Sequence, residues 1–222
     1  MQAVPLFGGA EPANAVDAHR LRVIVGMAAA LAEKGFVATT IADVARHARV
    51  SKRTFYEHFA TKEDCLIACY EVASEVALQT TLEAARPALD GTERARAATN
   101  AYLSVLESNP ALTRTLMMDI YASGPKALKV RRRAQKRFAD VFRRLVDQGR
   151  AQHPGTRKLS PAMATAVVGG INELVLLAVE EGRAHKLTQL ADTAYELVHA
   201  VLLALTAPPP ARSPRSATGH PS

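Results

Sequence analysis

Apolar residues recur at three- and four-residue intervals along most of the chain, and this spacing predicts amphipathic α-helices. The first helix is expected over about 17–34 and ends at Gly35, because a glycine just past a helix readily takes the left-handed conformation. Two short helices follow within 40–63. Longer helices are predicted at 63–86, 92–108, 110–121, 126–151, 160–182 and 188–206. The chain is therefore expected to be all-α.

The two short helices within 40–63 are marked by their own start signals. Thr40 is a favoured N-cap residue, and Asp43 three positions later completes a pattern like a capping box. Ser51 is a second N-cap, and Phe55 and Phe59 lie one turn apart on the face that would pack inward. The stretch therefore predicts a helix-turn-helix.

A helix-turn-helix reads DNA by placing its second helix in the major groove. Lysine and arginine can bind guanine edges there, while hydroxyl groups, histidine and tyrosine contact phosphates. Two short helices around a turn also occur in many proteins that bind no DNA. The shape alone therefore does not assign the function.

The local order of residue types is more specific than the shape. Residues 41–63 contain Ile-Ala-x-x-Ala, then Val-Ser-x-x-Thr-Phe-Tyr-x-His-Phe-x-x-Lys-Glu. This pattern closely resembles the N-terminal signature of the TetR/AcrR family of transcriptional regulators, over about residues 18–70. The resemblance implies about nine helices: a helix-turn-helix domain followed by a ligand-binding and dimerisation bundle. It also implies a repressor, not an enzyme, that a small molecule releases from a palindromic operator on double-stranded DNA.

The resemblance and the residue types together predict the DNA contacts. Lys52 and Arg53 are expected to read base edges, and the other members mainly to hold phosphates. The full predicted set is Thr40, Arg49, Ser51, Lys52, Arg53, Thr54, Tyr56, His58 and Lys62. Arg49 departs from the family pattern, which has glycine in the turn. A non-glycine residue in the left-handed conformation costs roughly 1–2 kcal/mol, so either the turn absorbs this cost or its geometry differs.

These patterns divide the chain into four segments. Residues 1–16 are rich in Pro, Gly and Ala and are expected to be a disordered arm, and 207–222 a disordered tail. The helix-turn-helix DNA-binding domain is expected at 17–62 and the helical regulatory and dimerisation domain at 63–206.

The positive charge of the chain is concentrated away from the helix-turn-helix. The net charge is +7, yet residues 124–158 hold twelve Lys or Arg against two acids. A solvated helix face is the commonest role of such a run. The run at 126–144 also fits an anion-binding wall of a ligand pocket, for an acyl-CoA or another acidic metabolite, or a supplementary attraction to DNA. The sequence leaves these three interpretations open.

Ligand and partner surfaces are expected in the second domain. The second half of the last helix is apolar on nearly every face, and Gly169-Gly170 lies in the middle of the helix before it, so a homodimer is predicted. The last two helices of TetR-type regulators usually form the dimer interface, which the resemblance extends to this chain. The predicted interface comprises Gly170, Ile171, Leu174, Leu197, Val201, Leu202 and Leu205. The plausible pocket lining is Tyr102, Met117, Met118, Tyr121, Phe138 and Phe142, although such residues are more often simply core.

The sequence gives only weak indications of redox or metal-binding chemistry. Cys65 and Cys69 lie four positions apart, and burial as small hydrophobic residues is favoured over a redox pair or half a metal site. No catalytic motif, metal site or cofactor is predicted. No run of 18 uncharged apolar residues occurs, so a cytoplasmic protein without a membrane helix is expected. The remaining alternative is a helical ligand-binding or redox-sensing protein without a DNA-binding function.

Overall fold

The computed structural model describes residues 15–86, 91–150 and 155–206. Within these ranges the chain is all-α, as the periodicity predicts. The elements are α1 (Ala15–Ala38), α2 (Ile41–Ala48), α3 (Lys52–His58), α4 (Lys62–Ala85), α5 (Gly91–Glu107), α6 (Pro110–Ala122), α7 (Gly124–Gly149), α8 (Pro161–Glu180), the 3-10 turn η2 (Leu187–Leu190) and α9 (Ala191–Thr206).

The helix ends lie close to the predicted ones because the cap residues set them. Ser160 accepts a hydrogen bond from the Met163 N–H at the start of α8, and Asn109 does the same for Leu112 at the start of α6. Gly35 has φ 74° and bends the end of α1, as predicted for a helix-terminating glycine. Two details differ: α1 begins at Ala15, inside the expected arm, and the last helix begins with η2. The rest of the arm and the tail at 207–222 lie outside the described residues.

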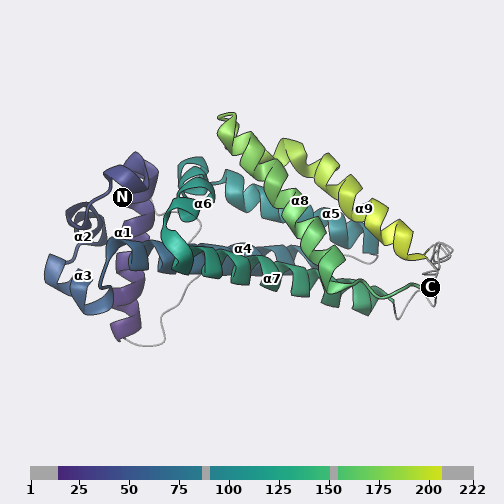
Figure 1. Ribbon diagram of the computed structural model, residues 1–222, viewed down its shortest axis with the longest axis horizontal. Coiled ribbons are helices and arrows are strands. Elements are labelled where there is room, and N and C mark those ends of the chain that lie inside the picture. The colour runs from purple at the N-terminus through teal and green to yellow at the C-terminus, as the bar shows by residue number, and fades with distance from the viewer. Residues whose placement is uncertain (1–14, 87–90, 151–154, 207–222) are drawn as a thin grey trace, which may run out of the picture.

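Helices α1–α3 form a compact head at one end of the molecule (Figure 1). Helices α4 and α7 run side by side away from the head, and α5, α8 and α9 complete a bundle at the far end (Figure 1). Helix α6 lies between the two parts and packs on α1, α7 and α8. The head therefore reaches the bundle through α4 and α6.

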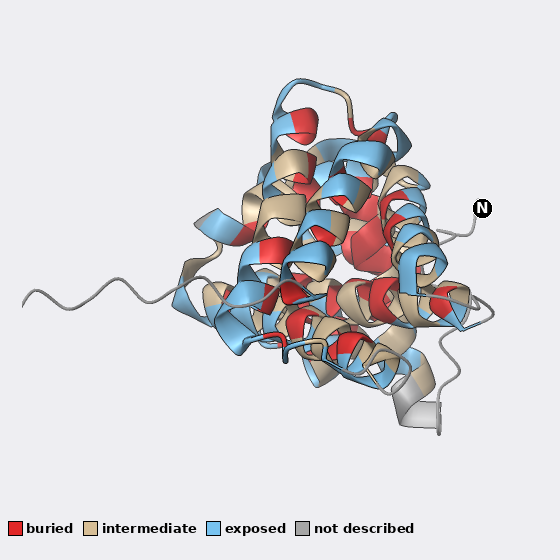
Figure 2. Cartoon of the chain, turned by 90° about the vertical axis from the view of Figure 1, so that its right-hand side faces the viewer, coloured by how far each residue is buried: buried red, intermediate tan, exposed pale blue. Residues whose placement is uncertain are grey.

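The head has its own apolar core. Met27 and Leu31 of α1 pack with Val44 of α2, Phe55 of α3 and Leu66 of α4, and each of them is buried. In the bundle, which faces the viewer in Figure 2, buried positions likewise lie on the inward turns of the helices and exposed ones on the outward turns. Complete burial of five large side chains contributes about 1.5–3 kcal/mol each relative to exposure. This core fixes the angle at which α3 is presented.

Helix α8 is strongly apolar, although much of its surface is exposed in the single chain. By length and composition it could cross a membrane, with a mean hydropathy of 1.8, yet only 28% of that stretch is buried within the chain. Asn172 lies at its centre and accepts a hydrogen bond of 2.6 Å from the Tyr102 hydroxyl of α5. Its buried face, including Val175 and Ala178, packs in the bundle. Helix α8 is therefore a core helix with one apolar face left uncovered.

Candidate functional site

The start of α2 carries the predicted capping box. The Thr40 hydroxyl accepts a hydrogen bond from the Asp43 N–H at 3.2 Å, and the Asp43 carboxylate accepts one from the Thr40 N–H at 2.8 Å. Lys34 lies 2.7 Å from the same carboxylate. The Lys34 ammonium and the Thr40 donors hold the pKa of Asp43 well below its usual value. The cap therefore stays charged and joins the end of α1 to the start of α2.

Arg49 takes the left-handed conformation that the family pattern reserves for glycine. Its φ is 54° and its ψ is 46°, and among the described residues it is the one non-glycine residue with positive φ. Its N–H reaches the Ala45 and Arg46 carbonyls and closes α2. The side chain is exposed beside the start of α3. The turn therefore keeps its geometry and bears the strain.

We expect Arg49→Gly to raise the free energy of unfolding by up to about 1 kcal/mol, because glycine adopts this conformation without a Cβ clash. Arg49→Ala keeps the strain and should give no such gain. If Arg49 contacts a phosphate, both variants lower the slope of log affinity against log salt by about one. Chemical denaturation and salt titrations of DNA binding measure the two effects. A wild-type salt slope in Arg49→Ala would contradict the phosphate contact.

Helix α3 is anchored on one side and free on the other. Ser51 accepts a hydrogen bond from the Thr54 N–H at 3.0 Å, which starts the helix. Phe55 is fully buried, and its ring centroid lies 5.9 Å from that of Phe59. On the opposite side Lys52 and Arg53 are exposed, Tyr56 has 56% of its surface accessible, and Thr54 and His58 are half-buried. Arg53 also pairs loosely with Glu57 at 3.3 Å, in an exposed contact of little energetic weight.

The predicted contact residue Lys62 has a structural role that the sequence did not reveal. Its ammonium donates hydrogen bonds to the Phe36 carbonyl at 2.9 Å and the Thr39 carbonyl at 2.8 Å, and lies 4.3 Å from the centre of the Phe36 ring. An ammonium group has three donors, so one remains for a phosphate. Lys62 thus ties the start of α4 to the loop that precedes α2.

Gly26 is a head residue whose role sequence reasoning missed. It lies in mid-α1, where an added Cβ would come within 2.7 Å of the Ala48 Cβ, the Ala48 nitrogen and the Val44 oxygen. Only glycine lets α2 pack this closely on α1. The signal in the sequence was a glycine inside a helical pattern, which costs roughly 1 kcal/mol of helix propensity relative to alanine.

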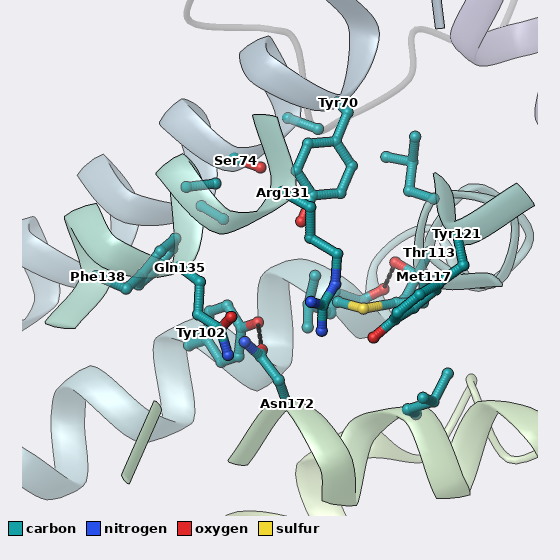
Figure 3. A pocket seen from close by; sticks show the side chains of 16 residues that line it. Tyr70, Ser74, Tyr102, Thr113, Met117, Tyr121, Arg131, Gln135, Phe138 and Asn172 are labelled. Atoms are coloured by element: carbon teal, nitrogen blue, oxygen red, sulfur yellow. Dashed lines mark hydrogen bonds between the residues drawn. The ribbon is translucent and has the colours of Figure 1, made fainter. Parts of the chain in front are cut away.

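A first cavity lies between α4, α5, α6, α7 and α8, and we call it the arginine cavity after Arg131. Its volume is about 60 Å³. Four predicted residues line it: Tyr102, Met117, Tyr121 and Phe138. The lining residues that sequence reasoning missed include polar ones, among them Tyr70, Ser74, Gln135 and Asn172. Figure 3 shows these side chains converging from several helices.

A second cavity, which we call the apolar cavity, adjoins the first. It has a volume of about 100 Å³ and is lined mainly by apolar side chains from α5, α7, α8 and α9, Phe142 among them. Tyr102, Phe138 and Asn172 line both cavities. The two aromatic rings meet edge-on with centroids 5.4 Å apart, and so form the wall between the cavities. The remaining predicted residue, Met118, packs instead on the buried apolar cluster that contains Leu103 and Val175.

The basic run on α7 divides between two environments. Most of its members are exposed, and several form surface ion pairs, such as Lys136 with Asp140 and Arg137 with Glu75. Arg131 alone in the run lines a described cavity. The run is therefore mainly a solvated face, with one arginine turned toward the interior.

The two cysteines lie in the apolar core next to α1. Both are buried and free. Burial raises the pKa of the Cys65 thiol to about 12 and also raises that of Cys69. Buried neutral thiols react slowly, so the geometry favours their interpretation as small hydrophobic residues. Among the described residues no group of three or more His, Cys, Asp and Glu side chains is placed to hold a metal ion.

The predicted dimer residues lie on α8 and α9, where two of them meet within the chain. A Cβ on Gly170 would come 3.2 Å from the Leu197 side chain, so this glycine permits close packing of α8 on α9. Leu205 is buried against Ala164 and Leu159. Large exposed apolar side chains nearby are Met163 and Leu177 of α8 and Leu203 of α9.

Solved structures share this fold. FadR from Bacillus subtilis, solved in complex with stearoyl-CoA, aligns with a TM-score of 0.69 and 18% identity over 80% of this chain and 96% of its own. The fatty acid degradation regulator FadR from Bacillus halodurans aligns at 0.70 and 19%, over 81% and 94%. GusR from Salmonella enterica aligns at 0.67 and 18%, over 86% and 98%. No curated protein sequence matches the chain.

The sequence itself matches a family profile in the head. Residues 24–69 match the profile described as bacterial regulatory proteins, tetR family. The matched range covers most of α1, all of α2 and α3, and the start of α4. The head of this chain thus carries the N-terminal DNA-binding domain of the tetR family of bacterial regulatory proteins, on a fold that solved regulators of that family share.

Proposed function

We propose that this protein is a cytoplasmic, homodimeric repressor that leaves a palindromic operator when a small molecule enters the bundle. The observation that carries the proposal is the position of α6, which contacts the head on one side and lines the arginine cavity on the other. A ligand in the cavity therefore acts on a helix that already touches the DNA-binding part.

The DNA-reading surface follows from the free side of α3. Lys52 and Arg53 extend from the first turn, the part of a recognition helix that meets base edges. The proposed phosphate contacts surround them: Thr40, Arg49, Ser51, Thr54, Tyr56, His58 and Lys62. Together they span the start of α2, the turn, α3 and the start of α4.

The coupling path runs through the outer contacts of α6. Met117 and Tyr121 line the arginine cavity. On the same helix the Asp119 carboxylate accepts a hydrogen bond of 3.1 Å from the Phe36 N–H, and Phe36 is also held by Lys62. A shift of α6 would therefore move the α1–α2 loop and the start of α4 together. The ligand regulates only if it binds the two arrangements with different affinity.

A second copy of the chain is the natural cover for α8 and α9. Met163 and Leu177 are 46% and 45% exposed on α8, and Leu203 is 55% exposed on α9. Met163, Gly170 and Leu177 recur every seven residues, so they share a face of α8 next to α9. The proposed interface also includes Ile171, Leu174, Leu197, Val201, Leu202 and Leu205. A two-fold dimer would set two heads on successive major grooves.

Replacing both Leu177 and Leu203 by glutamate is expected to convert a dimer into a monomer, because two like charges from each chain would meet in an apolar interface. Sedimentation equilibrium at micromolar concentration should give twice the chain mass of 23.8 kDa for the wild type and that mass for the variant. Glutamate at the exposed Ala111 of α6, away from the proposed interface, is the control. A monomeric wild type would contradict the dimer.

The effector is proposed to be a small organic molecule, apolar or acidic. FadR from Bacillus subtilis, which shares this fold, was solved in complex with stearoyl-CoA, and this supports a small-molecule effector for the present chain. Deleting the gene should raise the transcript beside the DNA site that the protein selects. A variant defective in DNA binding should fail to restore repression. A transcript that falls on deletion would make the protein an activator and contradict the proposal.

A further inference from the structure

Arg131 points into the arginine cavity and forms no ion pair with another described residue. Its guanidinium carbon lies 4.5 Å from the centre of the Tyr121 ring, and Figure 3 shows the group directed toward the middle of the arginine cavity. Among the ion pairs that the described residues of α7 form, none includes Arg131. By contrast, its neighbours Arg132 and Arg133 are exposed to solvent. A partly enclosed guanidinium without an anion is a strong recognition site for one.

The other described residues that line the arginine cavity supply no negative charge to balance Arg131. The arginine cavity is lined by no Asp or Glu among the described residues; its polar members are Tyr70, Ser74, Tyr102, Thr113, Tyr121, Gln135 and Asn172. Burial raises the pKa of the Tyr70 hydroxyl, partly opposed by the nearby Arg131 charge, and burial raises the pKa of Tyr102 as well. Both hydroxyls stay neutral donors at physiological pH. The cavity thus carries one positive charge surrounded by neutral hydrogen-bonding groups.

The size of the cavities limits the ligand. At about 60 Å³ the arginine cavity holds a group of a few atoms, not a nucleotide. Beyond the Tyr102–Phe138 wall the apolar cavity offers about 100 Å³, lined mainly by apolar residues such as Val141, Phe142 and Val167. Its polar side chains are Thr81, Thr99, Tyr102 and Asn172. Typical ligand pockets measure about 300–1,000 Å³. A ligand that spans both cavities must therefore displace the wall.

We propose that Arg131 binds the carboxylate of an amphipathic monocarboxylic acid, and that the apolar tail of this acid passes Tyr102 and Phe138 into the apolar cavity. This inference rests on the proposed function, since it names the class of effector for the same cavity. The planar guanidinium matches a carboxylate with two parallel hydrogen bonds. Displacing Tyr102 breaks its bond to Asn172 and joins the two cavities. The small head cavity favours a free acid over its coenzyme A thioester.

The test compares octanoic acid, whose short tail suits the apolar cavity, with its uncharged methyl ester, and isothermal titration calorimetry measures both affinities. We expect the wild type to bind the acid at least tenfold more tightly than the ester, as a charge-assisted pair to arginine implies. Arg131→Gln should bind acid and ester alike. Arg131→Lys should keep part of the preference, because it retains the charge but not the planar fork. Arg132→Gln removes the same charge one residue along on the exposed surface and should behave as the wild type.

Two results would overturn the inference: equal affinity of the wild type for acid and ester, or a preference that survives in Arg131→Gln. Failure of both probes to bind the wild type would overturn it too. Thermal melts of the variants check that each is folded. Operator release, measured in parallel, separates this inference from the proposed function. Acid that binds through Arg131 without releasing DNA supports the site and contradicts ligand-released repression. Acid that releases DNA from the wild type and from Arg131→Gln alike supports ligand-released repression and contradicts the Arg131 site.

Discussion

Replacing Lys52, Arg53 and Tyr56 by alanine is expected to weaken operator binding by at least a hundredfold while the fold is retained. All three side chains are exposed on α3, so their loss removes little packing, chiefly the edge-on contact of Tyr56 with Phe55. Each base or phosphate contact contributes about 1–3 kcal/mol, and three of them together therefore exceed the roughly 2.7 kcal/mol of a hundredfold change. The probe is a duplex selected by the wild type from a random library, with affinity measured by fluorescence anisotropy.

The matched control removes two positive charges elsewhere. Arg132 and Arg133 are as exposed as Lys52 and Arg53 but lie on α7. Their double alanine variant should keep its affinity within about threefold, since it loses only long-range attraction that salt screens. Equal losses in both variants would show that charge alone, not α3, directs binding. An unchanged affinity in the α3 variant would contradict the assignment of the recognition helix.

Gly26→Val is expected to lower the free energy of unfolding by about 2–3 kcal/mol and to abolish operator binding. The new Cβ alone would meet Ala48 and the Val44 carbonyl at 2.7 Å, two of these atoms being backbone that cannot rotate away. Overpacking of this kind typically costs about 1–3 kcal/mol, and relief requires α2 to move from α1. Because α2 sets the position of α3, DNA binding should fail even where the variant remains folded.

Gly149→Ala is the control for this variant. It lies at the end of α7, and a Cβ added there meets nothing within 4 Å. Its unfolding free energy and DNA affinity should match the wild type or slightly exceed it. Differential scanning calorimetry and operator titration measure both variants. A Gly26→Val protein with wild-type stability and DNA affinity would mean that neither folding nor DNA binding needs the close α1–α2 contact.

The sequence carries local signals, and the features predicted from it are local. Thr40, Ser51 and Ser160 cap helices where expected, because a cap depends on residues within three positions. The Phe55–Phe59 anchor follows for the same reason, whereas the sequence left the geometry of the turn at Arg49 open. Helix ends therefore agree closely with the periodicity, and so does the all-α fold.

Features that depend on distant contacts were not predictable in the same way. The role of Gly26 depends on Ala48, and that of Lys62 on the Phe36 and Thr39 carbonyls. The close approach of Gly170 to Leu197 of α9 likewise depends on a contact between helices that are distant in sequence. No single-sequence pattern specifies which surface of one helix meets which surface of another.

The inward direction of the Arg131 side chain was only partly predictable from the sequence. Arg131, Gln135 and Phe138 are spaced by four and three residues, so they share one face of α7. That spacing could have separated Arg131 from Arg132 and Arg133, which point elsewhere. In the sequence the run stands out as one block of positive charge, because its charge excess is more conspicuous than its periodicity. Asn172 was missed because its partner, Tyr102, is 70 residues away.

Hydroxyl-radical footprinting of the wild-type protein on its selected duplex tests the central claim most directly. A dimer that presents two α3 helices should protect two blocks related by two-fold symmetry, with centres about one helical turn or slightly more apart, on a sequence that reads alike on both strands. One asymmetric block, or a library in which no sequence is enriched, would contradict a dimeric regulator that reads a palindromic operator.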